Sequence, residues 1–216
     1  MSNVKRETSE KMIAIIDYGM GNLRSVQRAF EYVGAEAIVT TDRATIESAS
    51  AVVLPGVGAF GKAMANLEQA GLTDVIRQVI AQGRTFLGIC LGLQLLFEES
   101  DEMGLHRGLG IFGGQVKRFE IGLKVPQIGW NQIHTQRVSP LLEGVPDSSY
   151  AYFVHSYYVA PADPEIVLAT TDYEIDYAST IGRGNVFGIQ FHPEKSQAVG
   201  LRILRNFTML VEKNDQ

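Results

Sequence analysis

Short apolar runs alternate along this chain with segments in which apolar residues recur every three or four positions. The first run covers residues 12–17 and is apolar almost throughout. It is followed by apolar residues at helical spacing, namely Leu23, Val26, Phe30 and Val33. A short continuous apolar run is typical of a strand buried on both faces, and the helical spacing indicates one buried helix face. The pattern predicts a strand, a turn and a helix.

The same alternation continues through the first half of the chain. Three further strand-and-helix units follow, over residues 36–49, 51–71 and 85–99, with an additional helix at about 73–82. In the last unit the helix is predicted over residues 90–99. Such a succession is typical of a parallel sheet covered by helices on both faces. We therefore expect a three-layer α/β/α, flavodoxin-like fold.

Beyond residue 108 the pattern changes to strand-like segments separated by turns. Most of these strands are expected to pair antiparallel and to extend the sheet. A last helix is predicted over residues 196–213, with an apolar stripe of Val199, Ile203, Phe207 and Leu210. No linker or repeat interrupts this order, so residues 12–216 are predicted to form a single domain. The polar residues 1–11 are predicted to be a flexible extension.

Composition narrows the function classes. The net charge of −5 is spread over mixed acidic and basic residues, which argues against a nucleic-acid partner. The apolar runs are shorter than the ~18 residues that span a bilayer, so no membrane association is expected. The four histidines are dispersed and there is one cysteine, so no metal or cofactor is predicted. A free thiol fits a reducing cytoplasm best.

The single cysteine, Cys90, lies between Gly88 and Gly92 in the sequence GICLG. This pattern matches a nucleophile elbow, in which glycines two residues before and after the nucleophile allow a tight strand-to-helix turn. The start of the following helix would favour a thiolate and would leave backbone N–H groups free for an oxyanion. The alternative is inert packing, because a free cysteine is among the most buried residue types.

A thiol nucleophile needs a base, and the sequence FGIQFHPEKS supplies a candidate. His192 and Glu194 stand two residues apart at the end of an apolar strand, so they share a face if the chain stays extended there. Pro193 restricts His192 to the β or polyproline region. Glu194 could then orient the imidazole while His192 takes the thiol proton. The alternative is an ordinary surface histidine and glutamate on a turn.

A glycine-rich loop, PGVGAFG, follows the third predicted strand. Its amides could point into a site near the cysteine. Gly56, Gly58 and Gly61 also satisfy the spacing of a dinucleotide-binding loop. We discount a dinucleotide site, because the loop follows the third strand rather than the first, and no acid ends a neighbouring strand about 20 residues on. A non-catalytic nucleotide-binding module nevertheless stays open as a rival hypothesis.

Taken together, the motifs DYGMGNL, LPGVGAFG, GICLGLQLLFEES, PQIGWN, YFVHSYYV and QFHPEKS resemble, in that order, those of class I glutamine amidotransferases. The resemblance covers the chain from Met12 onward. It implies that Cys90 attacks the side-chain amide of glutamine, His192 acts as base and then protonates ammonia, and Glu194 orients His192. It also implies oxyanion contacts from the Leu91 amide and, after a peptide flip in the loop, from the Val57–Gly58 amides.

The resemblance also implies a glutamine pocket. The substrate-binding candidates are Gly56, Gln94, Glu102, His155, Ser156 and Tyr157. Gln94 lies one helical turn after Cys90, and the alternative for it is an ordinary polar residue on a helix surface. The Glu102 carboxylate could meet the substrate ammonium. His155 could instead be a packed histidine with no direct role.

Within the family, PGVG and PQIGWN favour the glutaminases that pass ammonia to a (β/α)8-barrel cyclase subunit. The candidates for that contact surface are Trp130, Asn131 and Tyr152, although Trp130 could equally be a core anchor. Transfer between subunits keeps ammonia away from bulk water, where it would be protonated. Two enzymatic alternatives stay open, an amidotransferase serving another synthase and a stand-alone cysteine hydrolase.

Overall fold

A computed structural model of the chain describes residues 12–214, with side chains up to residue 211. The predicted extension of residues 1–11 therefore lies outside the described residues. Within the described part, the strands are β1 Ile13–Ile16, β2 Ala37–Thr40, β3 Ala51–Gly56, β4 Thr85–Cys90, β5 Phe97–Ser100, β6 His106–Arg107, β7 Phe112–Arg118, β8 Gln127–Thr135, β9 Ser149–His155, β10 Tyr157–Pro161, β11 Val167–Asp172, β12 Asp176–Arg183 and β13 Val186–Ile189.

The helices lie mainly in the first half and at the end of the chain. They are α1 Leu23–Tyr32, α2 Arg43–Ser48, α3 Phe60–Gln69, α4 Leu72–Ala81, α5 Leu91–Leu95 and α6 Gln197–Asn214, with 3₁₀ turns η1 Pro140–Leu142, η2 Pro164–Ile166 and η3 Pro193–Lys195. These bounds agree with the predicted strand-and-helix units up to residue 90 and with the predicted last helix. The stripe on α6 faces the core, since Ile203 and Phe207 are fully buried.

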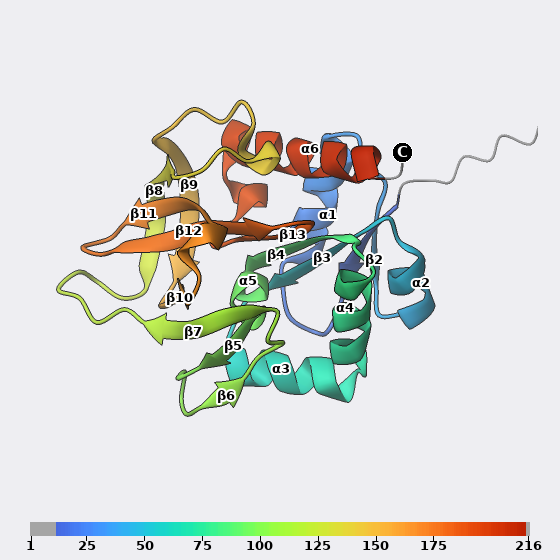
Figure 1. The fold of residues 1–216 in the computed structure, drawn as a ribbon, viewed down its shortest axis with the longest axis horizontal. Helices are drawn as coiled ribbons and strands as arrows, with labels where there is room; N and C mark the ends of the chain where they lie inside the picture. Colours follow the sequence, from blue (N-terminus) through green and yellow to red (C-terminus); the bar gives the residue numbers. More distant parts are fainter. Residues whose placement is uncertain (1–11, 215–216) are drawn as a thin grey trace, which may run out of the picture.

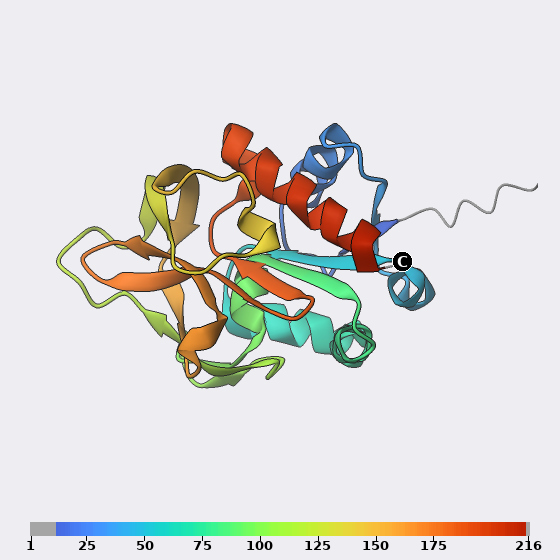
Figure 2. The same cartoon turned by 45° about the horizontal axis from the view of Figure 1, so that its top comes forward.

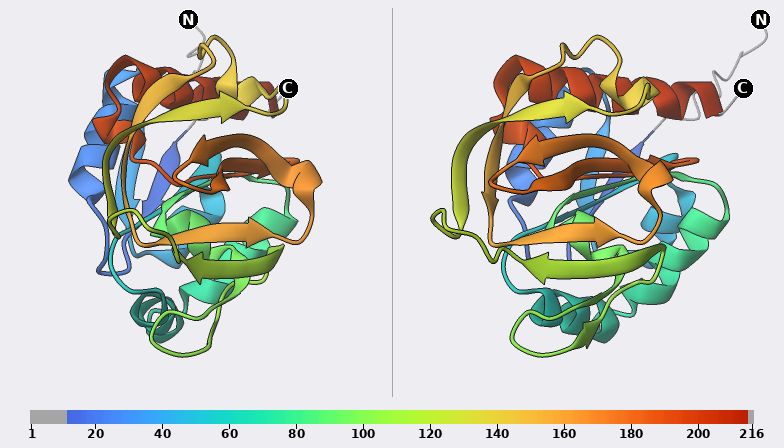
Figure 3. Two further views of the ribbon diagram at one scale, coloured as in Figure 1. Left: turned by 90° about the vertical axis from the view of Figure 1, so that its left-hand side faces the viewer. Right: turned by 60° about the vertical axis from the view of Figure 1, so that its left-hand side comes forward.

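The sheet has a parallel part and an antiparallel part. Strands β2, β1, β3, β4 and β13 lie side by side in this order and run parallel. Beyond β13 the sheet continues with β12, β10 and β7, each of which pairs antiparallel with its neighbour. A branch of β11, β8 and β9 leaves the sheet at β12 and forms the left-hand end of the molecule (Figure 1). Figure 3 shows β8 and β9 curving away from the strands beneath them. The site candidates on β4, β8 and β9 thus come from both parts.

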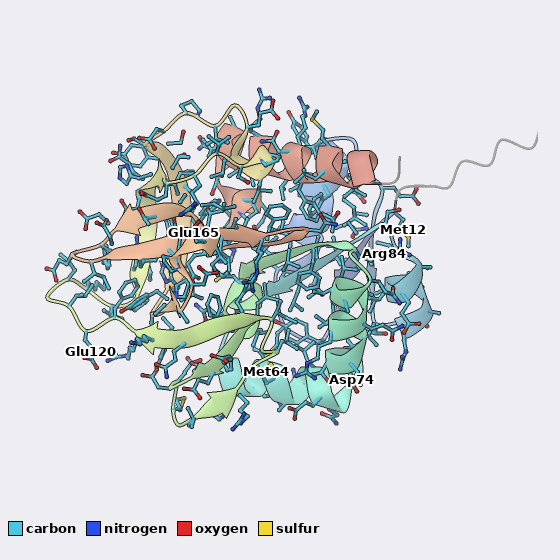
Figure 4. All side chains as sticks on the ribbon, in the orientation of Figure 1. Met12, Met64, Asp74, Arg84, Glu120 and Glu165 are labelled. Carbon is cyan, nitrogen blue, oxygen red and sulfur yellow. The ribbon has the colours of Figure 1, made fainter. Side chains whose placement is uncertain are left out.

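Helices cover both faces of the parallel part, as expected for a three-layer fold. Figure 2 shows α1 and α6 on one face and α3 and α4 on the other. Two apolar clusters fill the layers, one with Phe30 and Phe207 in ring contact at 5.9 Å, the other with Phe60 and Val75. Side chains occupy the space between sheet and helices throughout, while the labelled Asp74 lies on the outer side of α4 (Figure 4). Burial of these apolar side chains is the main contribution to stability.

The helix predicted over residues 90–99 is wrong in its second half. Helix α5 ends at Leu95, and residues 97–100 form strand β5, which pairs parallel with β7. Phe97 packs against Phe112 with 6.0 Å between ring centroids. Both rings are buried, so this tertiary packing overrides the local helical pattern. The short strand β6 was also missed, because a two-residue strand leaves no periodic signal.

Candidate functional site

Cys90 ends strand β4 and directly precedes helix α5, on a tight turn. Its φ is +55° and ψ is −110°, an unusual backbone conformation for a residue with a side chain. The glycines on either side allow this turn by close approach. A Cβ on Gly92 would lie 1.7 Å from the Leu54 carbonyl oxygen, and one on Gly88 would lie 2.7 Å from the Gly92 carbonyl oxygen. The predicted elbow geometry is therefore present, and strain of this kind clusters at functional sites.

His192 and Glu194 lie together beside Cys90. The Nδ1 atom of His192 is 2.9 Å from Oε1 of Glu194, and both side chains are almost fully buried. The chain is not extended through Glu194 as the sequence pattern suggested. His192 has extended backbone angles, but Pro193–Lys195 forms the turn η3, and this turn brings the carboxylate to the ring. The pair is buried and hydrogen-bonded, which argues against an ordinary surface turn.

The surroundings of His192 favour its charged form. Burial by itself lowers the pKa of His192, but the hydrogen bonds and charges of Cys90 and Glu194 outweigh it and raise the pKa to about 10. The side chain of Cys90 is thus in hydrogen-bonding contact with the ring that Glu194 holds. The candidate nucleophile, the candidate base and the candidate group that orients the base are together in one place, although they come from sequence positions about a hundred residues apart.

A cavity of about 220 Å³ opens in front of Cys90. Most of the candidates for oxyanion and substrate contacts line it, namely Val57, Gly58, Leu91, Gln94, Glu102, His155, Ser156 and Tyr157. Pro126 and Val154 line it as well and were not among the candidates. A larger cavity of about 420 Å³, bordered by Glu99, Lys117 and Arg118, contains none of the candidates. The smaller cavity is the candidate substrate pocket, because it alone of the two contains the thiol.

The loop after β3 lies against the elbow. Gly56 stands directly opposite Cys90 in the β3–β4 pairing, and Val57 and Gly58 follow it at the edge of the cavity. Gly58 has a φ of +102°, which a residue with a side chain rarely adopts. Leu91 is the first residue of α5, where backbone N–H groups have no partner inside the helix. The loop and the helix start therefore border the same cavity.

Gln94 is buried rather than on a helix surface. Its Nε2 atom donates to the Tyr157 carbonyl oxygen at 2.9 Å and to Oε1 of Gln190 at 3.1 Å. Gln190 in turn lies with Nε2 3.7 Å from Sγ of Cys90. Sequence reasoning missed Gln190 although it is in the same segment as His192. Its position two residues before the histidine, in a polar break of an apolar strand, was the available signal.

Glu102 lies in the turn after β5 and borders the cavity. Its Oε2 accepts a hydrogen bond from the backbone N–H of Phe60 at 2.5 Å. Phe60 is the first residue of α3, so this carboxylate satisfies a free N–H and complements the helix dipole. Glu102 therefore anchors α3, and its contact with the substrate ammonium stays a prediction.

His155 is held by its own network. Its Nδ1 lies 2.8 Å from the Tyr157 carbonyl oxygen, and its Nε2 lies 3.2 Å from the Tyr177 hydroxyl. The ring packs among aromatic side chains, including Phe119 and Phe153. Burial lowers the pKa of His155 to about 4, the Tyr157 hydrogen bond acts against this, and the charge of His192 lowers it further. His155 is thus a neutral, packed histidine whose main chain borders the cavity beside Ser156.

The three candidates for a partner contact lie on strands β8 and β9. Trp130 and Tyr152 are paired across the strands, with 5.9 Å between ring centroids, and Trp130 is 47% exposed, which excludes a core anchor. Asn131 donates from Nδ2 to the Asp172 carbonyl oxygen at 2.8 Å and so connects β8 to the end of β11. The exposed Ile128 and Val154 form another pair along the same strands. Sequence reasoning missed these two, because exposure of an apolar strand residue leaves no local signal.

Neither a metal cluster nor a membrane span is found in the part of the chain that the structure describes. Among residues 12–214, no three His, Cys, Asp or Glu side chains lie together as a metal site would require. In the same part of the chain, every helix is too short or too polar to cross a bilayer.

Comparison with known proteins identifies the family. The profile described as "Glutamine amidotransferase class-I" matches residues 14–211 of this chain. A protein of Moorella thermoacetica named imidazole glycerol phosphate synthase subunit HisH is 54% identical over 199 residues, covering 92% of this chain and 95% of that protein. The protein of the same name from Thermosynechococcus vestitus is 55% identical over 208 residues, covering 94% and 99%.

Solved structures show the same fold at low sequence identity. A crystal structure of a glutamine amidotransferase superposes with a TM-score of 0.74 at 22% identity, covering 93% of this chain and 98% of that one. A chain in the structure of PurLQS from Thermotoga maritima gives a TM-score of 0.72 at 18% identity, covering 96% and 100%. The expected α/β fold, mainly parallel with an antiparallel extension, is confirmed by these likenesses and by the strand order.

Proposed function

The chain belongs to the class I glutamine amidotransferase family, and we propose that it is the glutaminase subunit of an imidazole glycerol phosphate synthase. In this function it hydrolyses glutamine to glutamate and ammonia and passes the ammonia to a (β/α)8-barrel cyclase. The cyclase forms imidazole glycerol phosphate and an aminoimidazole carboxamide ribotide in histidine biosynthesis. The observation that carries the proposal is the buried His192–Glu194 pair at 2.9 Å, in contact with Cys90 at the mouth of a cavity.

The first half of the reaction forms a thioester. The sulfur of Cys90 attacks the side-chain carboxamide carbon of glutamine, and the carbonyl oxygen takes up negative charge. The Leu91 amide and the Val57–Gly58 amides stabilise that oxyanion. His192 holds the proton that came from the thiol, and it delivers this proton to the nitrogen as the C–N bond breaks. In the resting site the hydrogen bonds and charges of Cys90 and Glu194 raise the pKa of His192 to about 10, so the ring carries this proton at neutral pH before the leaving nitrogen requires it.

The second half releases glutamate. His192, now neutral, takes a proton from a water molecule, and the resulting hydroxide attacks the thioester carbon. The C–S bond breaks and releases the Cys90 thiolate and glutamate, while the proton taken from water stays on His192, which restores the resting pair. Glu194 keeps Nδ1 of the imidazole fixed throughout, so that Nε2 faces the sulfur. Gln94, Glu102 and the main chain at Ser156 and Tyr157 hold the substrate.

The proposed docking surface for the cyclase starts at the cavity and runs outward along β8 and β9. It consists of the cross-strand pairs Ile128 with Val154 and Trp130 with Tyr152, together with Tyr150, all of them exposed except the half-buried Tyr152. A contiguous exposed apolar stripe indicates an interaction site. Val154 also borders the cavity, so a partner on this surface lies directly over the point at which ammonia leaves. The free thiol suits the reducing cytoplasm.

A glutaminase assay with and without the barrel subunit tests the proposal. The isolated chain should hydrolyse glutamine weakly, and the barrel with its bound ribotide ligand should stimulate it markedly. In the complex, Cys90→Ala should abolish product formation from glutamine and leave product formation from added ammonium salt intact. This result separates loss of the nucleophile from loss of the complex.

The alternatives give different results in the same assay. High glutaminase or peptidase activity without a partner would identify a stand-alone hydrolase. No stimulation by the barrel, combined with capture of a different synthase, would identify another amidotransferase. Nucleotide binding that Cys90→Ala leaves unchanged, without any glutamine hydrolysis, would identify a binding module.

A further inference from the structure

Gln190 is a buried amide in the site that the triad chemistry does not use. It follows strand β13 directly, its side chain is fully buried, and its backbone N–H donates to the Ser179 carbonyl oxygen at 2.9 Å on β12. A buried primary amide carries two donor hydrogens and an acceptor oxygen, and each is costly to leave unpaired. The hydrogen-bond partners of the Gln190 side chain therefore indicate its role.

The polarity of this amide is fixed by its neighbours. The Tyr157 carbonyl can only accept, so Gln94 must present Nε2 to it at 2.9 Å. The second hydrogen of that Nε2 goes to Oε1 of Gln190 at 3.1 Å. The Nε2 of Gln190 then faces Sγ of Cys90, at 3.7 Å. One backbone carbonyl thus orders two amides and directs an N–H group at the sulfur.

The N–H group matters because the sulfur changes charge during the reaction. Sγ of Cys90 also lies 4.0 Å from the Val154 carbonyl oxygen, which can accept a hydrogen bond from a thiol but cannot stabilise a thiolate. Gln190 presents the opposite polarity, a donor that binds a negatively charged sulfur better than a neutral one. Gln190 therefore places a hydrogen-bond donor beside the atom that carries negative charge during the reaction.

The same arrangement determines what Gln94 offers to a ligand. Both hydrogens of its Nε2 are used within the protein, so its remaining oxygen is the atom left for a bound molecule. Gln94 lines the cavity, and an amide oxygen accepts from an N–H donor. A ligand with an ammonium or carboxamide N–H is therefore favoured over one with an acceptor at that point.

We propose that Gln190 is a catalytic residue, which donates a hydrogen bond to the Cys90 thiolate and holds Gln94 with its oxygen toward the substrate. This inference rests on the proposed glutaminase function for the identity of the substrate. The proposed effect of Gln190 on the sulfur does not depend on that function, because it concerns the reactivity of the Cys90 thiol in the free protein.

Two substitutions separate the two parts of the proposal. Gln190→Glu keeps an oxygen for Gln94 but replaces the N–H that faces the sulfur. Gln190→Met has similar length and removes both contacts. Asn206→Asp is the matched control, since Asn206 is also a buried amide, which donates to the Leu141 and Glu143 carbonyls far from Cys90 in sequence and outside the cavity.

Alkylation by iodoacetamide measures the thiolate directly, because Cys90 is the only cysteine and displaces iodide to form a thioether. At pH 7 the alkylation of Gln190→Glu and Gln190→Met should be slower than that of the native protein by about tenfold or more, as expected for loss of a hydrogen bond to a charged group. Asn206→Asp should react at the native rate. Far-UV circular dichroism and thermal unfolding confirm that each variant is folded.

Steady-state kinetics with the barrel partner then test the second role. Gln190→Glu should lower kcat and change KM for glutamine little, whereas Gln190→Met should also raise KM. Native alkylation rates in both variants would overturn the inference, even if glutaminase activity were lost. Conversely, slow alkylation of the variants in a protein without any glutaminase activity would support the role at the sulfur while contradicting the proposed function.

Discussion

The backbone N–H of His192 donates a hydrogen bond to the carbonyl oxygen of Tyr152 at 2.9 Å. Ser196 reinforces this contact, because its hydroxyl donates to the His192 carbonyl at 2.6 Å and accepts from the Tyr152 N–H at 3.0 Å. The strand that carries the proposed docking surface therefore holds the backbone of the proposed base. A partner that shifts β9 would shift His192 with it.

Removing the Ser196 hydroxyl should loosen this link. In Ser196→Ala the Tyr152 N–H and the His192 carbonyl each lose a buried partner, so we expect a loss of about 1–3 kcal/mol of unfolding free energy. We also expect kcat to fall more than KM rises, because the base is displaced while the pocket is unchanged. Urea unfolding and glutaminase kinetics of the complex measure the two effects.

Ser139→Ala is the control for this prediction. Ser139 is also a buried serine, and its hydroxyl accepts from the Leu141 N–H at 3.3 Å at the start of η1. Its loss should destabilise the protein and leave kcat unchanged. An equal fall of kcat in both variants would mean that general destabilisation, rather than the position of His192, sets the rate.

Glu194→Gln should impair turnover without displacing the ring. The variant keeps an acceptor oxygen but removes the negative charge that helps to raise the pKa of His192. We expect kcat to fall by about 10²- to 10⁴-fold, by analogy with the loss of the carboxylate in other triads. Glu165→Gln, in which an exposed ion pair with Arg137 is removed, should keep the native rate. A Glu194→Gln enzyme with native kcat would exclude an electrostatic role for this carboxylate.

Part of the site could be predicted from sequence, because its signals are local. The elbow around Cys90 depends on Gly88 and Gly92, and both lie within two residues of it. The pairing of His192 with Glu194 was also predicted from a two-residue spacing, although the turn that achieves it was not. Local spacing therefore predicted both the turn that carries the proposed nucleophile and the partner of the proposed base.

The features that sequence reasoning missed depend on contacts between distant segments. The local pattern predicts Phe97 in a helix, whereas its packing on Phe112 places it in a strand. Gln190 gains its role from Gln94 and Cys90, which lie 96 and 100 residues away. Neither periodicity nor motif spacing predicts that the buried amide of Gln190 will face the sulfur of Cys90. Such relationships become visible only once β4 and β13 are known to be neighbours.

Gly92→Ala tests whether the elbow requires close approach. The added Cβ would lie 1.7 Å from the carbonyl oxygen of Leu54, which belongs to strand β3 and cannot rotate away. We expect the variant to lose more than about 3 kcal/mol of unfolding free energy and its alkylation by iodoacetamide to be altered. Gly71→Ala is the control, because Gly71 has a φ of +66° but open space around it. That variant should lose only about 1–2 kcal/mol, and an equal loss in both would contradict the steric argument.

His155 should make the protein sensitive to acid. Its pKa in the folded protein is about 4, while the ordinary value is 6.5, so the folded state binds fewer protons than the unfolded state between these two values. Stability attributable to His155 is therefore complete above about pH 6.5 and is lost as the pH falls toward 4. The shift corresponds to about 3 kcal/mol at most.

Urea unfolding between pH 4 and 7 should show this loss in the native protein and a smaller one in His155→Gln. His134→Gln is the control, because it retains His155 and should therefore lose as much stability in acid as the native protein. If the native protein and His155→Gln lost stability equally as the pH falls, other groups would be the cause of the acid sensitivity.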